Sequence, residues 1–177
     1  MFRTIAILFA MLISFNSFAT NTPKELFSTI NLRLSYMEDV ALYKNNNSTP
    51  IEDRKREAIV IKNASLSAEK EGLNKESVIE FFSAQISVAK AIQYRYRADL
   101  LSKPTDKEPR DLETIIRPNL IKLGKDINTE LARYLREGGV FSKVEFKIFE
   151  NTLDSRYLTR SDKEMLFNAL TKIRLQQ

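Results

Sequence analysis

Among the charged residues between positions 31 and 57, five could act together in one site: Arg33, Lys44, Asp53, Arg56 and Glu57. Arg33 and Lys44 are eleven residues apart. At about 100° per residue they return to within about 20° of the same helix face. Arginine binds carboxylates through two parallel hydrogen bonds, and lysine offers a compact charge. If these side chains converge, they would form a site for a small dianion.

The face that carries Arg33 and Lys44 is apolar, with steps of three and four residues: Leu26, Ile30, Arg33, Met37, Val40 and Lys44. Each cation taken singly has a structural explanation, because its head can reach water along its own hydrocarbon stem. Asp53 and Glu57 likewise fit the N-terminus of a helix, where acids complement the helix dipole. A functional interpretation therefore requires several of these residues to converge.

Two more polar residues lie on or beside apolar helical stripes. Gln93 interrupts the stripe Ile79, Phe82, Ile86, Ala89, Gln93 and Tyr96. Arg117 lies one position from the stripe Leu112, Ile116, Leu120, Leu123, Ile127 and Leu131. Gln93 could be an amide that is satisfied between two helices. The functional alternative is a pocket between helices in which Gln93 is a neutral donor beside the cations.

The composition excludes several classes of chemistry. The 177 residues include no histidine and no cysteine. This excludes Ser-His and Cys-His nucleophiles, the usual zinc sites and disulfides. Four glycines, five prolines and no tryptophan favour a single all-helical domain. The basic residues are spread along the chain without a Lys/Arg block, so we expect no nucleic-acid partner.

Residues 1–19 have the pattern of a secretory signal peptide. Arg3 precedes an apolar run from Ile5 to Ile13, and Ser17-Phe18-Ala19 is a small-x-small cleavage site. The run is short for a bilayer span, so a retained anchor is the weaker alternative. We expect a mature chain from about Thr20, located in the periplasm or secreted, with no membrane association after cleavage.

Residues 20–177 are predicted to form one all-α bundle of about six helices. Cap and break signals indicate helices near 22–44, 50–72, 74–101, 111–135, 142–152 and 161–175. The capping-box pairs are Ser142 with Glu145 and Ser161 with Glu164. The segment 102–110 is interpreted as a loop inside the domain.

Several of these residues together resemble a known family. Arg33, Lys44, the segment 51–57 with Arg56, and Gln93 within 85–94 are similar in type and spacing to the all-helical chorismate mutases, best to their exported class. The resemblance extends more loosely through residues 111–118, which include Arg117. It implies a chorismate mutase type II-like bundle.

The resemblance also implies roles for individual residues. Arg33, Arg56 and Arg117 would hold the two carboxylates of chorismate. Lys44 and Gln93 would donate to its ether oxygen. Glu57, with Asp53, would receive the ring hydroxyl. Two pocket positions depart from the family pattern: Ala89 stands where many members have a hydroxyl residue, and Val60 where some have glutamine.

The reaction implied is the rearrangement of chorismate to prephenate, which needs no metal or cofactor. In shorter family members a partner chain donates one arginine, whereas the exported class would use Arg117 of the same chain. The sequence leaves open whether a homodimer forms. Two alternatives are an exported helical protein that binds a dicarboxylate or anionic lipid without turnover, and a periplasmic adaptor whose inward charges are structural.

Overall fold

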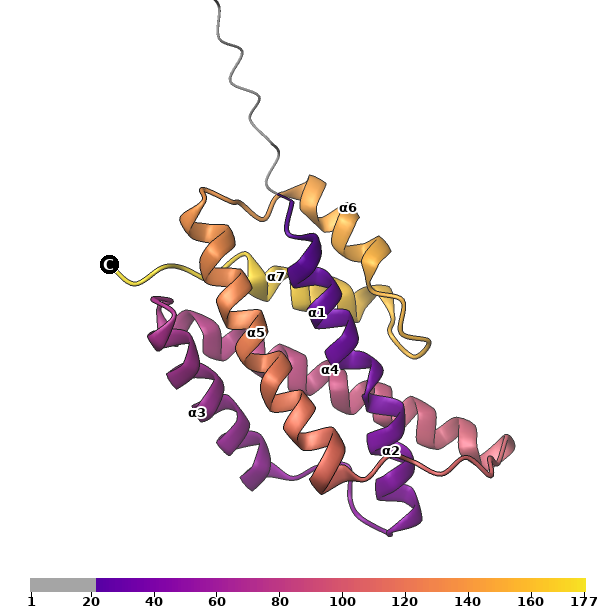
Figure 1. Cartoon of the computed structure of the whole chain (residues 1–177). Helices are drawn as coiled ribbons and strands as arrows, with labels where there is room; N and C mark the ends of the chain where they lie inside the picture. The colour runs from indigo at the N-terminus through magenta and orange to yellow at the C-terminus, as the bar shows by residue number, and fades with distance from the viewer. Residues whose placement is uncertain (1–21) are drawn as a thin grey trace, which may run out of the picture.

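The computed structural model describes residues 22–177, and the predicted signal peptide lies outside them. The all-helical prediction is confirmed, because the described chain consists of seven α-helices and one π-helical turn (Figure 1). The elements are α1 (Lys24–Ser35), α2 (Met37–Asn46), α3 (Arg54–Lys70), α4 (Lys75–Ser102), η1 (Leu112–Ile116), α5 (Arg117–Arg136), α6 (Lys143–Thr152) and α7 (Arg160–Leu170). Within residues 22–177, no helix has the length and apolar character to cross a membrane.

The longest helix, α4, organises the bundle. It packs against α2, α3 and α7, while α1 runs along α5 and also contacts α6 (Figure 1). Most of the buried apolar side chains form one cluster, and aromatic rings join α1 to the C-terminal helices. The Phe27 and Phe149 rings meet edge to face with their centroids 5.0 Å apart. This cluster fixes α1 and α4, which both contribute to the site.

The first predicted helix is divided into two at Tyr36. The backbone there stays in the right-handed helical region (φ −70°, ψ −15°), so α2 continues nearly along α1. Arg33, Met37, Val40 and Lys44 consequently keep one common face, as the spacing predicts. The division accounts for one helix more than expected.

Two predicted helix starts are wrong. Asp53 caps α3, with its Oδ1 accepting from the backbone N–H of Arg56 at 2.9 Å. The Thr49 hydroxyl instead donates to the carbonyl of Asn47. Ile51, between them, is buried, and the backbone at Asp53 (φ −140°, ψ 83°) is not helical, so the helix starts only after Asp53. Helix α7 begins after Thr159, which forms a capping box with Asp162, in place of Ser161 with Glu164.

Other predicted signals are confirmed. Asn74 caps α4, and Ser142 with Glu145 forms the capping box of α6. Gly72 (φ 76°) and Gly138 (φ 79°) follow the ends of α3 and α5 in the left-handed conformation. The predicted inward face of α4 is partly wrong. Ile79 was included but is exposed, and the buried face is wider than predicted, because it also includes Val78, Phe81, Gln85, Val88 and Ile92.

A buried carboxylate fastens the 103–110 connection onto α2. Asp39 is 4% exposed. It accepts from Lys107 Nζ at 2.9 Å and pairs with Arg110, whose guanidinium also lies 4.3 Å from the centre of the Tyr36 ring. The connection then enters η1, which Asp111 caps. Asp39 thereby helps to place the start of α5, where Arg117 lies.

The pKa of Asp39 is lowered in the folded protein. Burial alone would raise it, but the hydrogen bonds and charges of Lys107 and Arg110 outweigh burial. A carboxyl whose folded pKa lies below its unfolded value stabilises the fold above the unfolded pKa. That contribution is lost as the pH falls through the folded pKa.

We therefore predict that Asp39→Asn lowers the free energy of unfolding at pH 7 by about 1–3 kcal/mol. Urea unfolding should show the difference from the parent protein shrinking below about pH 4. Asp126→Asn, which removes only an exposed pair with Lys122, is the control and should change stability by less than about 1 kcal/mol. A difference that stays constant from pH 7 to pH 3 would contradict the Asp39 assignment.

Candidate active site

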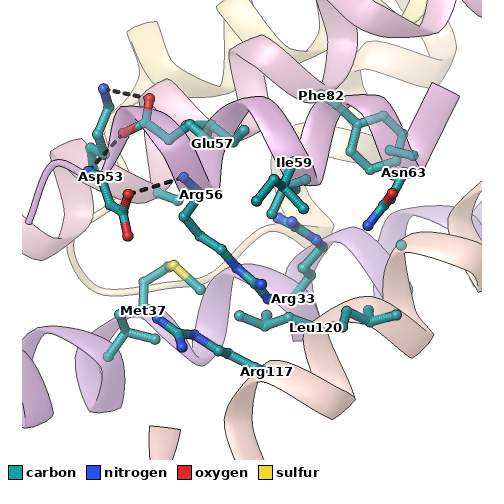
Figure 2. Close-up of a pocket in the computed structure, with 18 of the residues that line it drawn as sticks. Arg33, Met37, Asp53, Arg56, Glu57, Ile59, Asn63, Phe82, Arg117 and Leu120 are labelled. Carbon is teal, nitrogen blue, oxygen red and sulfur yellow. Dashed lines mark hydrogen bonds and ion pairs between the residues drawn. The ribbon is translucent and has the colours of Figure 1, made fainter. Parts of the chain in front are cut away.

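All nine residues predicted from the sequence line one cavity of about 230 Å³ between α1, α2, α3, α4 and α5. They are Arg33, Lys44, Asp53, Arg56, Glu57, Val60, Ala89, Gln93 and Arg117. Figure 2 shows Arg33, Arg56 and Arg117 reaching toward a common space from three different helices. The convergence that the functional interpretation requires is therefore present.

Arg33 is the most deeply buried of the cations, with 6% of its surface exposed. Its Nη1 donates to Gln85 Oε1 at 3.2 Å, and its Nε has no partner within residues 22–177. Burial lowers the pKa of Arg33 to about 10, so the group remains charged at neutral pH. A buried guanidinium with unused donors and no carboxylate partner is suited to an anionic ligand.

Arg56 and Arg117 present two further guanidinium groups to the cavity. In the described part of the chain, the Arg56 guanidinium makes no hydrogen bond or ion pair, because the Asp53 contact uses only the Arg56 backbone. Arg117 pairs with Glu113, one turn earlier and half exposed. Such a partly exposed pair is weak and can yield to a buried carboxylate. Both arginines can therefore turn to a bound dianion.

Lys44 lies at the end of α2 with its ammonium against the following loop. Its Nζ donates to the carbonyl oxygen of Ile51 at 2.6 Å, which leaves two hydrogens for a ligand. Burial lowers the pKa of Lys44, the charge of Asp53 opposes this, and that of Arg117 adds to it. Arg97 steadies the loop by donating from Nη2 to the carbonyls of Lys44 (3.4 Å) and Thr49 (3.2 Å).

Gln93 projects from α4 into the cavity and is buried. Its Nε2 donates to the carbonyl oxygen of Ala89 at 3.1 Å and contacts Met37 Sδ at 3.6 Å. Its Oε1 has no partner among the described residues. Nε2 donates to both the Ala89 oxygen and the Met37 sulfur, so both amide hydrogens are engaged, but sulfur is a weak acceptor and a ligand oxygen can replace it. Gln93 is thus a neutral donor inside a cationic cavity.

The two acids at the start of α3 are already engaged. Asp53 is the helix cap, and its backbone N–H donates to Glu57 Oε1 at 3.3 Å (Figure 2). Glu57 Oε2 lies 3.2 Å from Lys90 Nζ. Neither carboxylate pairs with Arg33 or Arg56 within residues 22–177, so the arginines remain available. Asp53 thus lies at the N-terminus of a helix, as its residue type indicates, and it also lines the cavity.

The positions that depart from the family pattern make part of the wall apolar. Val60 and Ala89 line the cavity together with Met37, Val40 and Leu112. These groups reduce contact with water, which strengthens the interactions of the nearby charges. Two contacts that a hydroxyl and a glutamine would supply are replaced by methyl groups.

Sequence reasoning missed Gln85, Lys90 and Arg97. Gln85 is fully buried and is the hydrogen-bond partner of Arg33, and Lys90 lines the cavity. The signal for Gln85 was its position four residues before Ala89 and eight before Gln93 on a helix, which places it near the same face. Lys90 and Arg97 carried no comparable signal, because isolated basic residues on a long helix are usually solvated.

We predict that Gln85→Leu lowers the free energy of unfolding by about 1–3 kcal/mol, since it removes the acceptor of a buried charged donor. The double variant Arg33→Met with Gln85→Leu should be more stable than Gln85→Leu alone, because removing both partners leaves no unpaired buried charge. Urea unfolding of the four proteins of this cycle provides the measurement. Strictly additive effects would show that Gln85 does not interact with Arg33.

The chain is similar in sequence and in fold to known proteins. The chorismate mutase type II family matches residues 22–94. A secreted chorismate mutase of Yersinia pestis is 43% identical over 148 residues, which are 83% of this chain and 79% of that protein. A monofunctional chorismate mutase of Enterobacter agglomerans is 38% identical over 152 residues, covering 85% and 83%.

Solved structures agree in fold. The crystal structure of the secreted chorismate mutase from Yersinia pestis superposes with a TM-score of 0.80 at 41% identity, covering 86% of this chain and 98% of that one. A chorismate mutase structure from Burkholderia thailandensis gives a TM-score of 0.70 at 27% identity, with coverage of 85% and 97%. The similarity extends beyond the N-terminal helices to the whole bundle.

Proposed function

The chain belongs to the chorismate mutase family, whose members are isomerases, and we propose that its cavity binds chorismate through the residues described above. Arg33, Arg56 and Arg117 hold the two carboxylates. Lys44 and Gln93 donate to the ether oxygen, and Glu57 accepts from the ring hydroxyl. The observation that supports this best is the convergence of three guanidinium groups with the Gln93 amide in a single cavity.

The chemical step is pericyclic, so the chain's own groups need only hold the substrate and stabilise charge. In one concerted rearrangement the ether carbon–oxygen bond breaks and a carbon–carbon bond forms, with no covalent enzyme intermediate and no proton transfer. The arginines hold the flexible enolpyruvyl group over the ring, which is an effect of proximity and orientation. This explains how a chain without histidine or cysteine can act as an enzyme.

Charge develops on the ether oxygen because its bond to carbon breaks ahead of carbon–carbon bonding. Lys44 and Gln93 are donors on α2 and α4, two helices that pack against each other at the cavity. Donors held in place before the reaction need no reorganisation as charge appears, and a water-poor site increases their effect. A protein that only binds a dicarboxylate does not require such a neutral donor, and the comparisons give that alternative no support.

We also propose that the protein is exported and that one chain supplies the whole site. The signal-peptide pattern and the relative from Yersinia pestis, which is named secreted, support export to the periplasm or beyond. Arg117 lies on the same chain as Arg33 and Arg56, so a second copy is not needed to supply an arginine to this cavity.

We predict that Arg33→Ala and Arg56→Ala each lower kcat/KM for chorismate by about 100-fold or more, because each removes a charged partner from a buried carboxylate. Loss of the ultraviolet absorbance of chorismate, followed in the presence of a chelator, gives the rates. Arg117→Ala tests the third arginine in the same assay. Arg54→Ala is the control, because Arg54 is exposed on α3 and does not line the cavity.

These variants should retain the circular dichroism spectrum of a helical protein. If Arg33→Ala and Arg56→Ala were folded and kept near-normal kinetics, the carboxylate assignment would be wrong. A parent protein that left chorismate unchanged would instead favour a binding protein without turnover.

We predict that Gln93→Glu lowers kcat at neutral pH by roughly 10²–10³-fold, the size of effect seen when one oxyanion donor is removed. A glutamate there can donate only when protonated, so activity should rise toward acid. Lys44 would move that rise to lower pH, whereas burial would move it to higher pH. Gln93→Leu, which cannot donate at any pH, is the control and should show no acid recovery. If the pH–rate profile of Gln93→Glu ran parallel to that of the parent protein, Gln93 would not contact the ether oxygen and its role would be structural.

A further inference from the structure

Lys90 lies in the cavity wall but has no place in the assignment above. It projects from α4 toward the start of α3, with its side chain about one quarter exposed. Its Nζ lies 3.2 Å from Glu57 Oε2 and 3.7 Å from Glu52 Oε1. Glu52 is half exposed and lies outside the cavity lining, whereas Glu57 lines the cavity. The shorter contact therefore joins Lys90 to the acid that faces the ligand.

The Glu57 carboxylate is held at both oxygens. Oε1 accepts from the Asp53 N–H at 3.3 Å (Figure 2), and Oε2 accepts from Lys90 Nζ at 3.2 Å. A carboxylate has about four lone-pair sites, so both oxygens can still accept from a ligand. The contact between the Asp53 N–H and Oε1 is long, and both residues belong to the start of α3. Lys90 is the partner that reaches Glu57 from a second helix and fixes its direction.

This contact also controls where the negative charge of Glu57 acts. Glu57 is close enough to Lys44 to influence its charge state. A Glu57 side chain free to rotate could pair with Lys44 or with the unpaired Arg56 and neutralise a cation that a dianion needs. Held by Lys90, the carboxylate remains at the α3–α4 side of the cavity.

We propose that Lys90 is a positioning residue that holds the Glu57 carboxylate where it accepts a hydrogen bond from the ring hydroxyl of chorismate. Lys90 thereby sets the preference of the enzyme for a substrate that has this hydroxyl. The inference rests on the proposed function of the cavity and extends it to substrate specificity. It assigns to Lys90 no contact with the carboxylates or with the ether oxygen.

The test compares two substrates, chorismate and the analogue in which hydrogen replaces the ring hydroxyl. Lys90→Met retains the length and apolar stem of the side chain but removes its charge. We expect kcat/KM for chorismate to fall by about tenfold, the effect of weakening one hydrogen bond to a charged group. For the analogue we expect a change of less than about twofold, because the hydroxyl is missing. Lys90→Arg should restore most of the preference.

A matched control breaks another ion pair between the same two helices. Lys75 on α4 lies 3.1 Å from Glu69 on α3, and neither lines the cavity. Lys75→Met should leave both substrates unaffected. In addition, adding Lys90→Met to the Glu57→Gln variant should not lower kcat/KM for chorismate any further, because Lys90 acts through Glu57.

Three outcomes would overturn the proposal. Equal losses of Lys90→Met on both substrates would place Lys90 on a carboxylate, and unchanged kinetics would make the pair structural. A full additional loss in the Glu57→Gln background would show that Lys90 acts independently of Glu57. If Lys90→Met did not fold, the preference of Lys90→Arg and Glu57→Gln for the two substrates would decide the question. Failure of the parent protein to convert chorismate would count against the proposed function itself.

Discussion

The burial of the Arg33 charge is the constraint on which the rest of the site depends. A guanidinium that loses its water must regain hydrogen bonds and an opposing charge, or the fold is destabilised. Within residues 22–177, Arg33 has one neutral acceptor, Gln85, and no carboxylate. The apolar core around α1 and α4 has to hold this uncompensated charge in place. A dianion that binds there completes the electrostatics, so ligand binding and folding stability are linked.

The same constraint explains how the acids of the bundle are distributed. A carboxylate free to swing into the cavity would neutralise an arginine and compete with the ligand. Asp53 instead caps α3, Glu57 is held by Lys90, and Asp39 is used outside the cavity to fasten the 103–110 connection. Fixing these acids elsewhere leaves Arg33 and Arg56 without a carboxylate partner within residues 22–177, while Arg117 pairs only with the exposed Glu113. The site therefore owes its charge to contacts that lie at its edge or outside it.

Local sequence signals predicted what depends on local structure. The eleven-residue spacing of Arg33 and Lys44 survives the break at Tyr36 because the backbone there remains helical. The caps at Asn74 and Ser142 depend on neighbours three residues away and were identified correctly.

The errors have tertiary causes. Thr159 pairs with Asp162 in the cap of α7, and Asp162 is also held by Arg95 at 2.6 Å, a contact across 67 positions that no local pattern shows. The partners of Gln85 and Lys90 likewise lie on other helices, so spacing can place Gln85 near the face of Gln93 but cannot identify Arg33 or Glu57 as the partners.

The apolar positions Val60 and Ala89 give the remaining donors greater weight. The family resemblance implies a glutamine or a hydroxyl residue at these positions in other members, whereas Val60 and Ala89 present only methyl groups to the cavity. On the proposed assignment, the ether oxygen then depends on Lys44 and Gln93 alone. The methyl groups exclude water, and a fixed donor acts more strongly on developing charge in a site of low dielectric constant. Fewer donors in a drier cavity can thus give the same stabilisation as more donors in a wetter one, provided that α2 and α4 hold Lys44 and Gln93 rigidly.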